Sequence, residues 1–367
     1  MEEQIKEKSE VEFKEWDSPY NPFNSLKVLL WRSHLDAIAR GEFLPPVSAD
    51  IDPSNLCNLD CSWCIQARYR KSNEGLVSGE LLLKLARFLG HWGVKGVCIG
   101  GGGEPLINDA VPELIRELAA SNVQPSLITN GTLLSAPVRE SLVDCAGFCG
   151  VSVDAGNADD WVKEKRAGPE MFRKLIANIE ELAALRDRRN SPLTIGYKMV
   201  IHPSNYSGIL EAASLARSIG ANEFHIRPAY LPDPSVFTDE IIESVKEQIT
   251  EARDSQTEKF KVYGIMHKFT PDWRKKLRFP KCLASPLTAT FGADRMLHLC
   301  CDRRGQKGML LCSYEDPEKV LQFWNSRYHH ELVDAIRIEE CPRCTFAAYN
   351  EVMEKVILQD AMNKNFI

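Results

Sequence analysis

The sequence predicts an α/β fold in which helices cover a parallel sheet. Between residues 47 and 255, short apolar strands alternate six times with amphipathic helices. The loops between them are short, which favours parallel strands joined by right-handed crossovers. Apolar residues make up 44% of the 367 residues, which is ample for a core. Six such units form a partial barrel or an open doubly wound sheet, and in both the ligand site lies at the carboxyl ends of the strands.

Each of the six units begins with a strand and ends with a helix. The expected strands are 47–53, 94–101, 124–131, 147–156, 192–203 and 221–231. The expected helices are 78–93, 110–122, 136–145, 169–188, 206–220 and 238–255. The first of these helices carries clear end signals, because Ser78 can cap its N-terminus and Gly93 can end it.

The βα rhythm changes after residue 255, which divides the chain into three expected domains. These are an N-terminal extension over 1–46, a core over 47–255 and a smaller α+β domain over 256–367. The extension has helical periodicity over 21–42. The last domain should hold, in order, a strand within 259–269, a hairpin over 285–301 that turns at Gly292–Asp294, and helices over 317–337 and 345–363.

Composition excludes several classes of partner. The net charge is −6 and the pI is near 5.9, so there is no basic footprint for nucleic acid. The charged N-terminus lacks the apolar segment of a signal peptide. No apolar run reaches the roughly 18 residues of a membrane helix. We therefore expect a soluble, cytoplasmic protein that binds neither nucleic acid nor membrane.

The most informative motif is a C-x3-C-x2-C triplet, Cys57, Cys61 and Cys64, directly after the first strand. A disulfide would leave one thiol over, and disulfides are rare in the cytoplasm. A zinc site needs a fourth ligand, and no cysteine follows within thirty residues. Three thiolates can instead hold three irons of a four-iron four-sulfur cluster and leave the fourth iron open for a substrate or cofactor. A zinc loop with a distant fourth ligand is the alternative.

This triplet resembles the cluster motif of the radical S-adenosylmethionine (radical SAM) superfamily, which has the same spacing and an aromatic residue before the third cysteine, here Trp63. The resemblance implies a partial (β/α)6 barrel. It also implies that the methionyl amino and carboxylate groups of S-adenosylmethionine chelate the open iron. Reductive cleavage then yields a 5′-deoxyadenosyl radical that abstracts a hydrogen atom from the substrate.

Further family motifs follow at the ends of the next strands. Gly102, Gly103 and Glu104 match the family's GGE motif, in which glycines permit a close backbone approach and the carboxylate accepts the methionyl ammonium. "TNG", residues 129–131, resembles a common ending of the third strand, and Asn130 is its candidate cofactor contact. An ordinary glycine turn and a structural role are the alternatives for these two motifs.

Strands four to six supply five more candidates. Ser152 and Asp154 alternate, so both point to one face, and the family places such a pair near the ribose and the methionyl carboxylate. Lys198 lies within the sheet region, where the cofactor carboxylate would supply a counter-charge. His225 and Arg227 share a face and are candidates for binding substrate or accepting its proton. The alternatives are a loop cap, an edge lysine that reaches water, and a structural ion pair.

A second cysteine set lies in the last domain: Cys282, Cys300, Cys341 and Cys344. The segment "GADRMLHLC" resembles the strand before the second cysteine of the auxiliary-cluster domains called SPASM and twitch. Cys344 is the last cysteine of the chain, so the resemblance implies one auxiliary cluster, as in a twitch domain, with all four irons held by protein. A four-cysteine zinc site is the alternative, and Cys301 could replace Cys300.

The other cysteines have weaker interpretations. Free cysteines often serve as small apolar core residues, and we expect this of Cys98 in its buried strand. Cys301 or Cys312 could donate a hydrogen atom in an epimerase.

The sequence thus predicts an enzyme that abstracts a hydrogen atom from a small or medium polar substrate, with a two-electron oxidation through the auxiliary cluster. We expect two four-iron four-sulfur clusters and an electron donor such as flavodoxin or ferredoxin. The alternatives are an epimerase or rearrangement enzyme acting on a sugar or nucleotide, and an enzyme that modifies a ribosomal peptide. A non-catalytic iron–sulfur or zinc protein is the alternative outside enzymes.

Overall fold

The computed structural model describes residues 24–72, 75–231, 233–265, 269, 279–341 and 344–357. Residues 1–23 of the expected extension and the end of the last expected helix, 358–363, lie outside this part of the chain. The three-domain division stays a prediction.

The described strands form one continuous ten-stranded sheet in the order β10-β9-β8-β1-β2-β3-β4-β5-β6-β7. The bounds are β1 Ser48–Ile51, β2 Gly96–Ile99, β3 Gln124–Thr129, β4 Phe148–Ser152, β5 Thr194–Ile201, β6 Glu223–Pro228, β7 Lys261–Gly264, β8 Thr288–Phe291, β9 Met296–His298 and β10 Leu310–Ser313. Strands β1 to β7 pair in parallel, and β8 pairs in parallel with β1. Among the described strands, β9 pairs antiparallel with both of its neighbours, β8 and β10.

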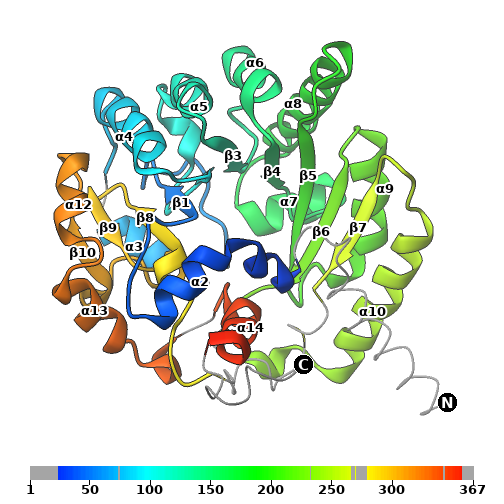
Figure 1. The fold of residues 1–367 in the computed structure, drawn as a ribbon. Coiled ribbons are helices and arrows are strands. Elements are labelled where there is room, and N and C mark those ends of the chain that lie inside the picture. Colours follow the sequence, from blue (N-terminus) through cyan, green and yellow to red (C-terminus); the bar gives the residue numbers. More distant parts are fainter. Residues whose placement is uncertain are drawn as a thin grey trace.

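The sheet curves without closing, which confirms the predicted partial barrel (Figure 1). Each of the six expected strands is present. The strand expected within 259–269 is β7, and it extends the barrel sheet by pairing with β6. The expected hairpin is β8–β9, where Arg295 takes a left-handed backbone conformation with φ +62°. The sheet therefore runs unbroken from the predicted core into the predicted last domain.

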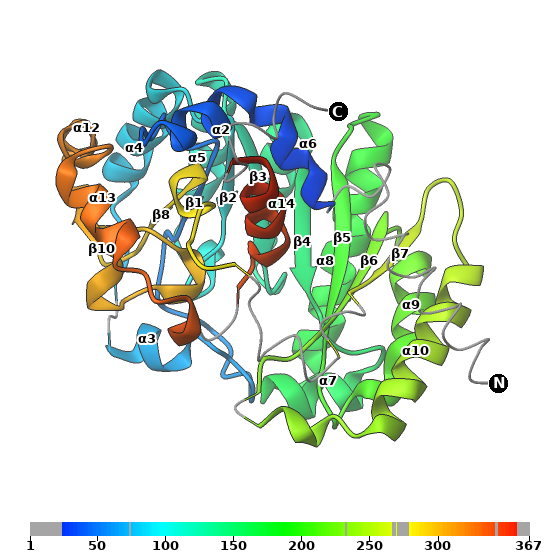
Figure 2. The same ribbon diagram turned by 60° about the horizontal axis from the view of Figure 1, so that its bottom comes forward.

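Helices cover the outer, convex side of the sheet (Figures 1 and 2). Their bounds are α4 Gly79–Trp92, α5 Val111–Ala120, α6 Ala136–Cys145, α8 Pro169–Arg188, α9 Ile209–Ser218 and α10 Asp239–Asp254. The predicted end signals of α4 are present, since the Ser78 side chain accepts from Leu81 N and Gly93 has φ +98°. Two short helices were not predicted: α3 Ala67–Ser72, after the cysteine triplet, and α7 Ala158–Lys165, after β4.

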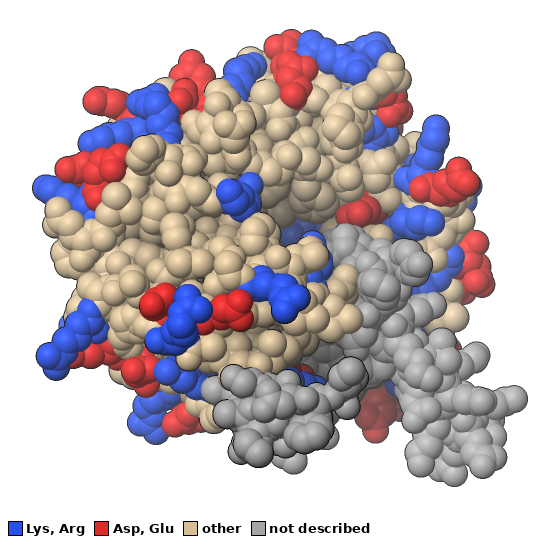
Figure 3. Space-filling model, in the orientation of Figure 1, with Lys and Arg blue, Asp and Glu red and all other residues tan. Residues whose placement is uncertain are grey.

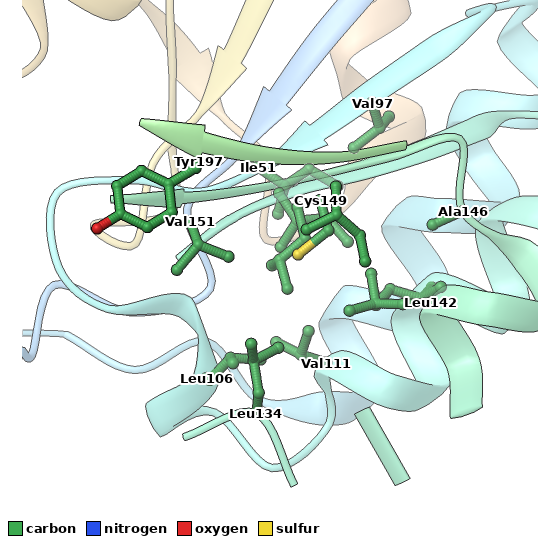
Figure 4. Close-up of a cluster of buried hydrophobic side chains, with 14 of the residues drawn as sticks. Ile51, Val97, Leu106, Val111, Leu134, Leu142, Ala146, Cys149, Val151 and Tyr197 are labelled. Atoms are coloured by element: carbon green, nitrogen blue, oxygen red, sulfur yellow. The ribbon is translucent and has the colours of Figure 1, made fainter. Parts of the chain in front are cut away.

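The main core lies between the outer face of the sheet and these helices. Figure 4 shows Ile51, Val97, Cys149 and Val151 of the sheet facing Leu106, Val111, Leu134 and Leu142. The alternation of the strands sends these side chains outward to the helices, so the intervening residues face the inside of the barrel.

The helices outside the six units pack separately. The segment expected at 317–337 contains α12 Val320–Phe323 and α13 Arg327–Asp334. The 3₁₀ helix η1 Ser25–Trp31 and α2 Arg32–Ala39 contact α14 Ala347–Ile357 through a small apolar cluster that includes Val28, Leu35 and Met353. Among the described residues, no helix combines the length and apolar character needed to span a bilayer.

Candidate active site

The cysteine triplet lies in the loop after β1, at the carboxyl edge of the sheet. Cys64 N donates to Cys61 O at 3.2 Å, and Ala67 N donates to Cys64 O at 3.1 Å, so the triplet coils into the start of α3. Burial raises the pKa of the Cys57 and Cys61 thiols. The neighbouring Glu104 and Cys61 raise that of Cys57 further, and Asp154 and Cys64 have the same effect on Cys61. The loop therefore gathers its three thiols beside the ends of β2 and β4.

Glu104 is buried at the end of the glycine-rich loop and accepts three hydrogen bonds. Thr129 Oγ1 donates at 2.5 Å and Leu106 N at 3.2 Å, both to Oε1, and Asn130 N donates at 2.8 Å to Oε2. Burial raises the pKa of Glu104 to about 7, and these hydrogen bonds oppose the rise. Oε2 has one protein donor where Oε1 has two, so it retains capacity to accept another.

The glycine-rich loop packs against the backbone of the cysteine loop. Glu104 N donates to Leu56 O at 2.8 Å, and Gly103 N donates to Ser54 O at 3.1 Å. A Cβ on Gly103 would collide with Leu56 O. Gly101 has φ +130°, and a Cβ there would lie 2.8 Å from Asp52 Cβ. The glycines are therefore needed for the packing of the two loops against each other. This role is additional to the close approach of a ligand that the sequence predicts.

Asn130 also serves the cysteine loop. Its Nδ2 donates to Asn58 Oδ1 at 2.8 Å, and Asn58 Nδ2 donates to Thr132 Oγ1 at 2.8 Å. Asn58 directly follows Cys57, so this network ties the end of β3 to the first cysteine of the triplet. A structural role for the "TNG" segment, one of the alternatives, therefore has direct support.

Asp154 faces a buried lysine that the sequence did not single out. The Asp154 carboxylate pairs with Lys165 Nζ and accepts from Val200 N at 2.7 Å. Burial alone would lower the pKa of Lys165, but Asp154 and Cys61 together raise it above its ordinary value. The strand ends at Ser152, and the left-handed backbone of Asp154, φ +67°, interrupts the alternation on which the shared-face prediction rested.

Trp63 lies beside the same lysine. Its ring stacks on His202 with centroids 5.5 Å apart, and Lys165 Nζ is 5.9 Å from the Trp63 ring centroid. Lys165 is the last residue of α7 and is buried next to the triplet. The charged sequence around it, "KEKR", is typical of a solvent-exposed helix face. Only the tertiary contacts show that Lys165, the third of these residues, is buried.

The inner face of the barrel is polar. Lys198 lies opposite Ser152 on one side and opposite His225 on the other, so three predicted residues follow one another across β4, β5 and β6. His225 Nε2 lies 2.7 Å from Glu223 Oε2, and its ring stacks on Phe148 with centroids 5.8 Å apart. Burial lowers the pKa of His225, although Glu223 opposes this. Figure 3 shows the molecule hollowed on this side, with basic side chains inside the hollow.

The other end of the inner face carries an acid and a thiol that the sequence did not assign there. Asp50 on β1 lies opposite Cys98 on β2 and Thr290 on β8. Cys98 is half-buried on this inner face rather than part of the core, which corrects its expected position. Burial raises the pKa of Asp50 to about 6 and that of Cys98 to about 12. At neutral pH the thiol is therefore protonated.

The cysteines of the second set influence one another electrostatically. Burial raises the pKa of Cys282 to about 12, and Cys300 and Cys341 add to the rise. Burial likewise raises the pKa of Cys344, with Cys282 and Cys300 contributing. A hydrogen bond with Cys300, burial and the charge of Asp50 raise the pKa of the Cys301 thiol, and the ligand atoms of Cys300, Cys301 and Asp302 all lie within 4.8 Å of one another. The choice of Cys300 over Cys301 as the fourth member stays a prediction. Cys149 and Cys312 lie in the core.

Arg304 connects the two cysteine regions. It follows Cys300 by four residues, and its Nε lies 2.6 Å from Asp52 Oδ2 while its Nη2 donates to Asp52 Oδ1 at 3.0 Å. Both side chains are buried, and Asp52 directly follows β1. A two-pronged contact of this kind is geometrically specific. It fixes the segment after β9 against the strand that leads into the cysteine triplet.

Comparison with known proteins agrees with this geometry. The model of the radical SAM superfamily matches residues 51–216, from the end of β1 into α9. The chain contains a radical SAM domain. The family match covers the cysteine triplet, Glu104, Asp154 and Lys198, and it stops before the second cysteine set.

Curated relatives match about half of this chain. They include a probable GTP 3′,8-cyclase of Sulfolobus acidocaldarius, 27% identical over 47% of this chain and 53% of its own length. The PqqA peptide cyclase of Gluconobacter oxydans is 28% identical over 50% of this chain and 49% of its own. The chain thus spans about half the length of these relatives, and their names differ in substrate.

Solved structures resemble a larger part of the fold. Streptococcus suis SuiB aligns with a TM-score of 0.63 over 90% of this chain and 79% of its own, at 16% identity. The structure of anSMEcpe with bound AdoMet aligns with a TM-score of 0.58 over 87% of this chain and 98% of its own, also at 16% identity. At this identity the resemblance establishes the fold, which extends beyond the family match.

Proposed function

We propose that Cys57, Cys61 and Cys64 hold a four-iron four-sulfur cluster whose open iron binds S-adenosylmethionine. The observation that carries this proposal is the convergence of three thiols, with no fourth in the loop, beside Glu104 and Lys165 inside a radical SAM domain. The donor set fits because thiolates are the usual ligands of such clusters. When bound, cluster and cofactor would supply a 5′-deoxyadenosyl radical that abstracts a hydrogen atom from a substrate.

Protein side chains would hold the cofactor in stated roles. Glu104 Oε2 accepts the methionyl ammonium, because it has spare acceptor capacity in a buried site. Trp63, Gly102, Gly103, Asn130, Ser152, Asp154 and Lys198 remain the other proposed contacts. Lys165 neutralises Asp154 and places a positive charge beside Cys61, which would stabilise thiolates there. Lys198 and Ser152 lie on the inner face, where the ribose and carboxylate would reach them.

The second cysteine set, Cys282, Cys300, Cys341 and Cys344, would hold an auxiliary cluster of the twitch kind. Four thiols fit either a fully ligated iron–sulfur cluster or zinc. As a cluster it would supply a one-electron acceptor, which suits the two-electron oxidation of a small polar substrate. The substrate proton would pass to His225, whose imidazole is held by Glu223, or to Arg227.

Epimerisation is a second candidate, and one observation favours it. A hydrogen donor is needed on the inner face, and Cys98 carries a protonated thiol there. Cys312 lies in the core and is poorly placed for this role, while Cys301 lies close to Asp50.

Anaerobic metal analysis tests the proposal. Reconstituted protein should contain about eight irons and eight sulfides per chain for two clusters. About four irons with one zinc would contradict the proposed auxiliary cluster but not the proposed cluster of the triplet. A substrate screen scored by 5′-deoxyadenosine release, with flavodoxin or ferredoxin as electron donor, would then identify the small-molecule substrate.

A further inference from the structure

We propose that Asp50 determines substrate specificity by accepting the ammonium group of a polar, amine-bearing substrate. The inference rests on the proposed function, because it names the substrate class of the same site. It concerns the part of the inner face that β8, β1 and β2 form. We call this part the acid subsite and define it by Asp50, Cys98 and Thr290, which lie side by side on the three strands.

Asp50 is an acid without a basic partner in a position where charge is costly. The described strands contain two acids, Asp50 and Glu223, and Glu223 Oε2 lies 2.7 Å from His225 Nε2. Within the described part of the chain, Asp50 forms no ion pair, and the hydrogen bond to its carboxylate comes from Thr290 Oγ1 at 3.4 Å. Burial raises the pKa of Asp50 to about 6. The carboxylate therefore retains acceptor capacity for a ligand.

The side chains beside Asp50 are small and uncharged. Cys98 flanks it on β2 and Thr290 on β8, and neighbouring strands of a sheet lie about 4.8 Å apart. Burial raises the pKa of Cys98 to about 12, so its thiol carries no charge at neutral pH. Asp50 and Cys98 are both partly exposed. A small ligand on the inner face can therefore reach the carboxylate and the thiol together.

The charges around Asp50 leave the subsite negative. Asp52 and Asp302 act on Asp50 as further negative charges, and Arg304 acts on it as a positive charge. Arg304 is already paired with Asp52, through contacts of 2.6 and 3.0 Å. These three acids and one base together carry a net charge of −2 when all are ionised. An ammonium group would gain from this charge, and an anionic group would be repelled.

The basic residues of the inner face lie on other strands. Lys198 is on β5 and Arg227 on β6, and two strands, β3 and β4, separate β5 from β2. Among the charged groups that act on the Cys98 thiol, Asp50 has the largest effect, and Lys198 and Arg304 oppose it. The inner face is thus polarised from one wall to the other. A bound substrate would direct its ammonium group toward Asp50 and away from the basic wall.

Cys98 can report the charge of the subsite before any substrate is known. Anaerobic reconstituted protein is treated with methanethiosulfonate reagents that carry either a trimethylammonium or a sulfonate group, and modified residues are identified by peptide mass spectrometry. After division by the rates with 2-mercaptoethanol, the cationic reagent should modify Cys98 about tenfold faster than the anionic one. In Asp50→Asn this preference should fall to about threefold or less. Cys145, at the end of α6, is the internal control, and its preference should be equal in both proteins.

Matched ligands test the substrate class itself. Each polar amine of a panel is paired with the analogue that carries a hydroxyl group in its place, and glucosamine with glucose is the first pair. With dithionite as reductant, amines should stimulate 5′-deoxyadenosine release at about tenfold lower concentration than their hydroxyl analogues, because a charge-assisted hydrogen bond is stronger. Asp50→Asn should abolish this difference. Hydroxyl analogues that act as well as the amines would overturn the assignment of an ammonium group.

The labelling experiment also decides the proposal independently of cofactor cleavage. Equal modification of Cys98 by both reagents, an unchanged preference in Asp50→Asn, or a Cys98 that neither reagent reaches overturns the acid subsite. Asp50→Asn should melt no lower than the wild type, because the amide removes a costly charge, and a lower melting temperature would assign Asp50 a structural role instead. Failure of the wild type to cleave the cofactor with dithionite would count against the proposed function, whereas the reagent preference at Cys98 would still test Asp50.

Discussion

Glu104→Gln is the substitution whose effect the site defines best. The amide keeps the size of the side chain but replaces one carboxylate oxygen with a donor. If the amide oxygen keeps the bonds from Leu106 N and Thr129 Oγ1, the NH₂ group faces Asn130 N, and two donors then oppose each other. The substitution also removes the charge that would pair with the methionyl ammonium.

The magnitude follows from these contacts. A charge-assisted hydrogen bond contributes about 1.5–3 kcal/mol, so the affinity for S-adenosylmethionine should fall about ten- to a hundredfold. The lost bond to Asn130 N should cost about 1–3 kcal/mol of unfolding free energy. Glu113→Gln, on the exposed side of α5, is the matched control and should change neither quantity.

The pH dependence gives a second signature. Because burial raises the pKa of Glu104 to about 7, the free protein holds this carboxyl protonated below that pH. An ammonium ligand needs the carboxylate, so wild-type affinity should increase as the pH rises toward 7 and then level off. The Gln variant should lack that increase. Anaerobic calorimetry between pH 5.5 and 8.5 measures both effects. Unchanged affinity in the variant, with wild-type pH dependence, would refute the assigned role of Glu104.

Three further predictions address other parts of the chain. Cys282→Ala, Cys341→Ala should lose about four irons and still cleave the cofactor, yet make no oxidised product; normal product formation would contradict the electron-acceptor role. Burial lowers the pKa of His329 to about 3, so the folded protein keeps this histidine neutral while the unfolded chain binds a proton below about pH 6.5. The free energy of unfolding should therefore decrease as the pH falls, by about 2–3 kcal/mol at pH 4.5. In denaturant titrations, His329→Leu should flatten the pH dependence of the unfolding free energy, and His330→Gln should leave it in place. Parallel pH profiles of the unfolding free energy for wild type and His329→Leu would contradict this prediction. Gly131→Ala should cost about 2–4 kcal/mol of unfolding free energy, because φ is +77° and the new Cβ would meet Leu175 and lie 2.6 Å from Val151 Cγ1. Gly41→Ala, with φ +76° and open space, should cost only about 1–2 kcal/mol, and equal losses would show that crowding at Gly131 is unimportant.

The βα architecture could be predicted because local patterns determine it. Caps such as Ser78 and glycine stops such as Gly93 act within a few residues, and alternating burial follows from strand geometry. The hairpin at 285–301 was predictable for the same reason. Helix α7 was missed because its charged sequence gives little apolar periodicity, and its position depends on packing against α8.

Residues of the candidate site could be predicted from the sequence only where they belong to a recognisable motif. The cysteine triplet and Glu104 have sequence signatures, but Lys165, Asp50 and Arg304 have none. Arg304 is defined by Asp52, 252 residues away, and Asp50 by Thr290, 240 residues away. Lys165 pairs with Asp154, which is only 11 residues away, but this buried ion pair follows from the left-handed turn after β4 rather than from strand alternation.

The central claim is that the triplet builds the cofactor-cleaving site, and 5′-deoxyadenosine formation tests it most directly. The measurement compares reconstituted wild-type protein with Cys57→Ala, Cys61→Ala, Cys64→Ala under dithionite, with iron counted in both samples. The wild type should form 5′-deoxyadenosine, and the triple variant should form none while it keeps the irons of the second cysteine set. Undiminished 5′-deoxyadenosine formation by the triple variant would contradict the account.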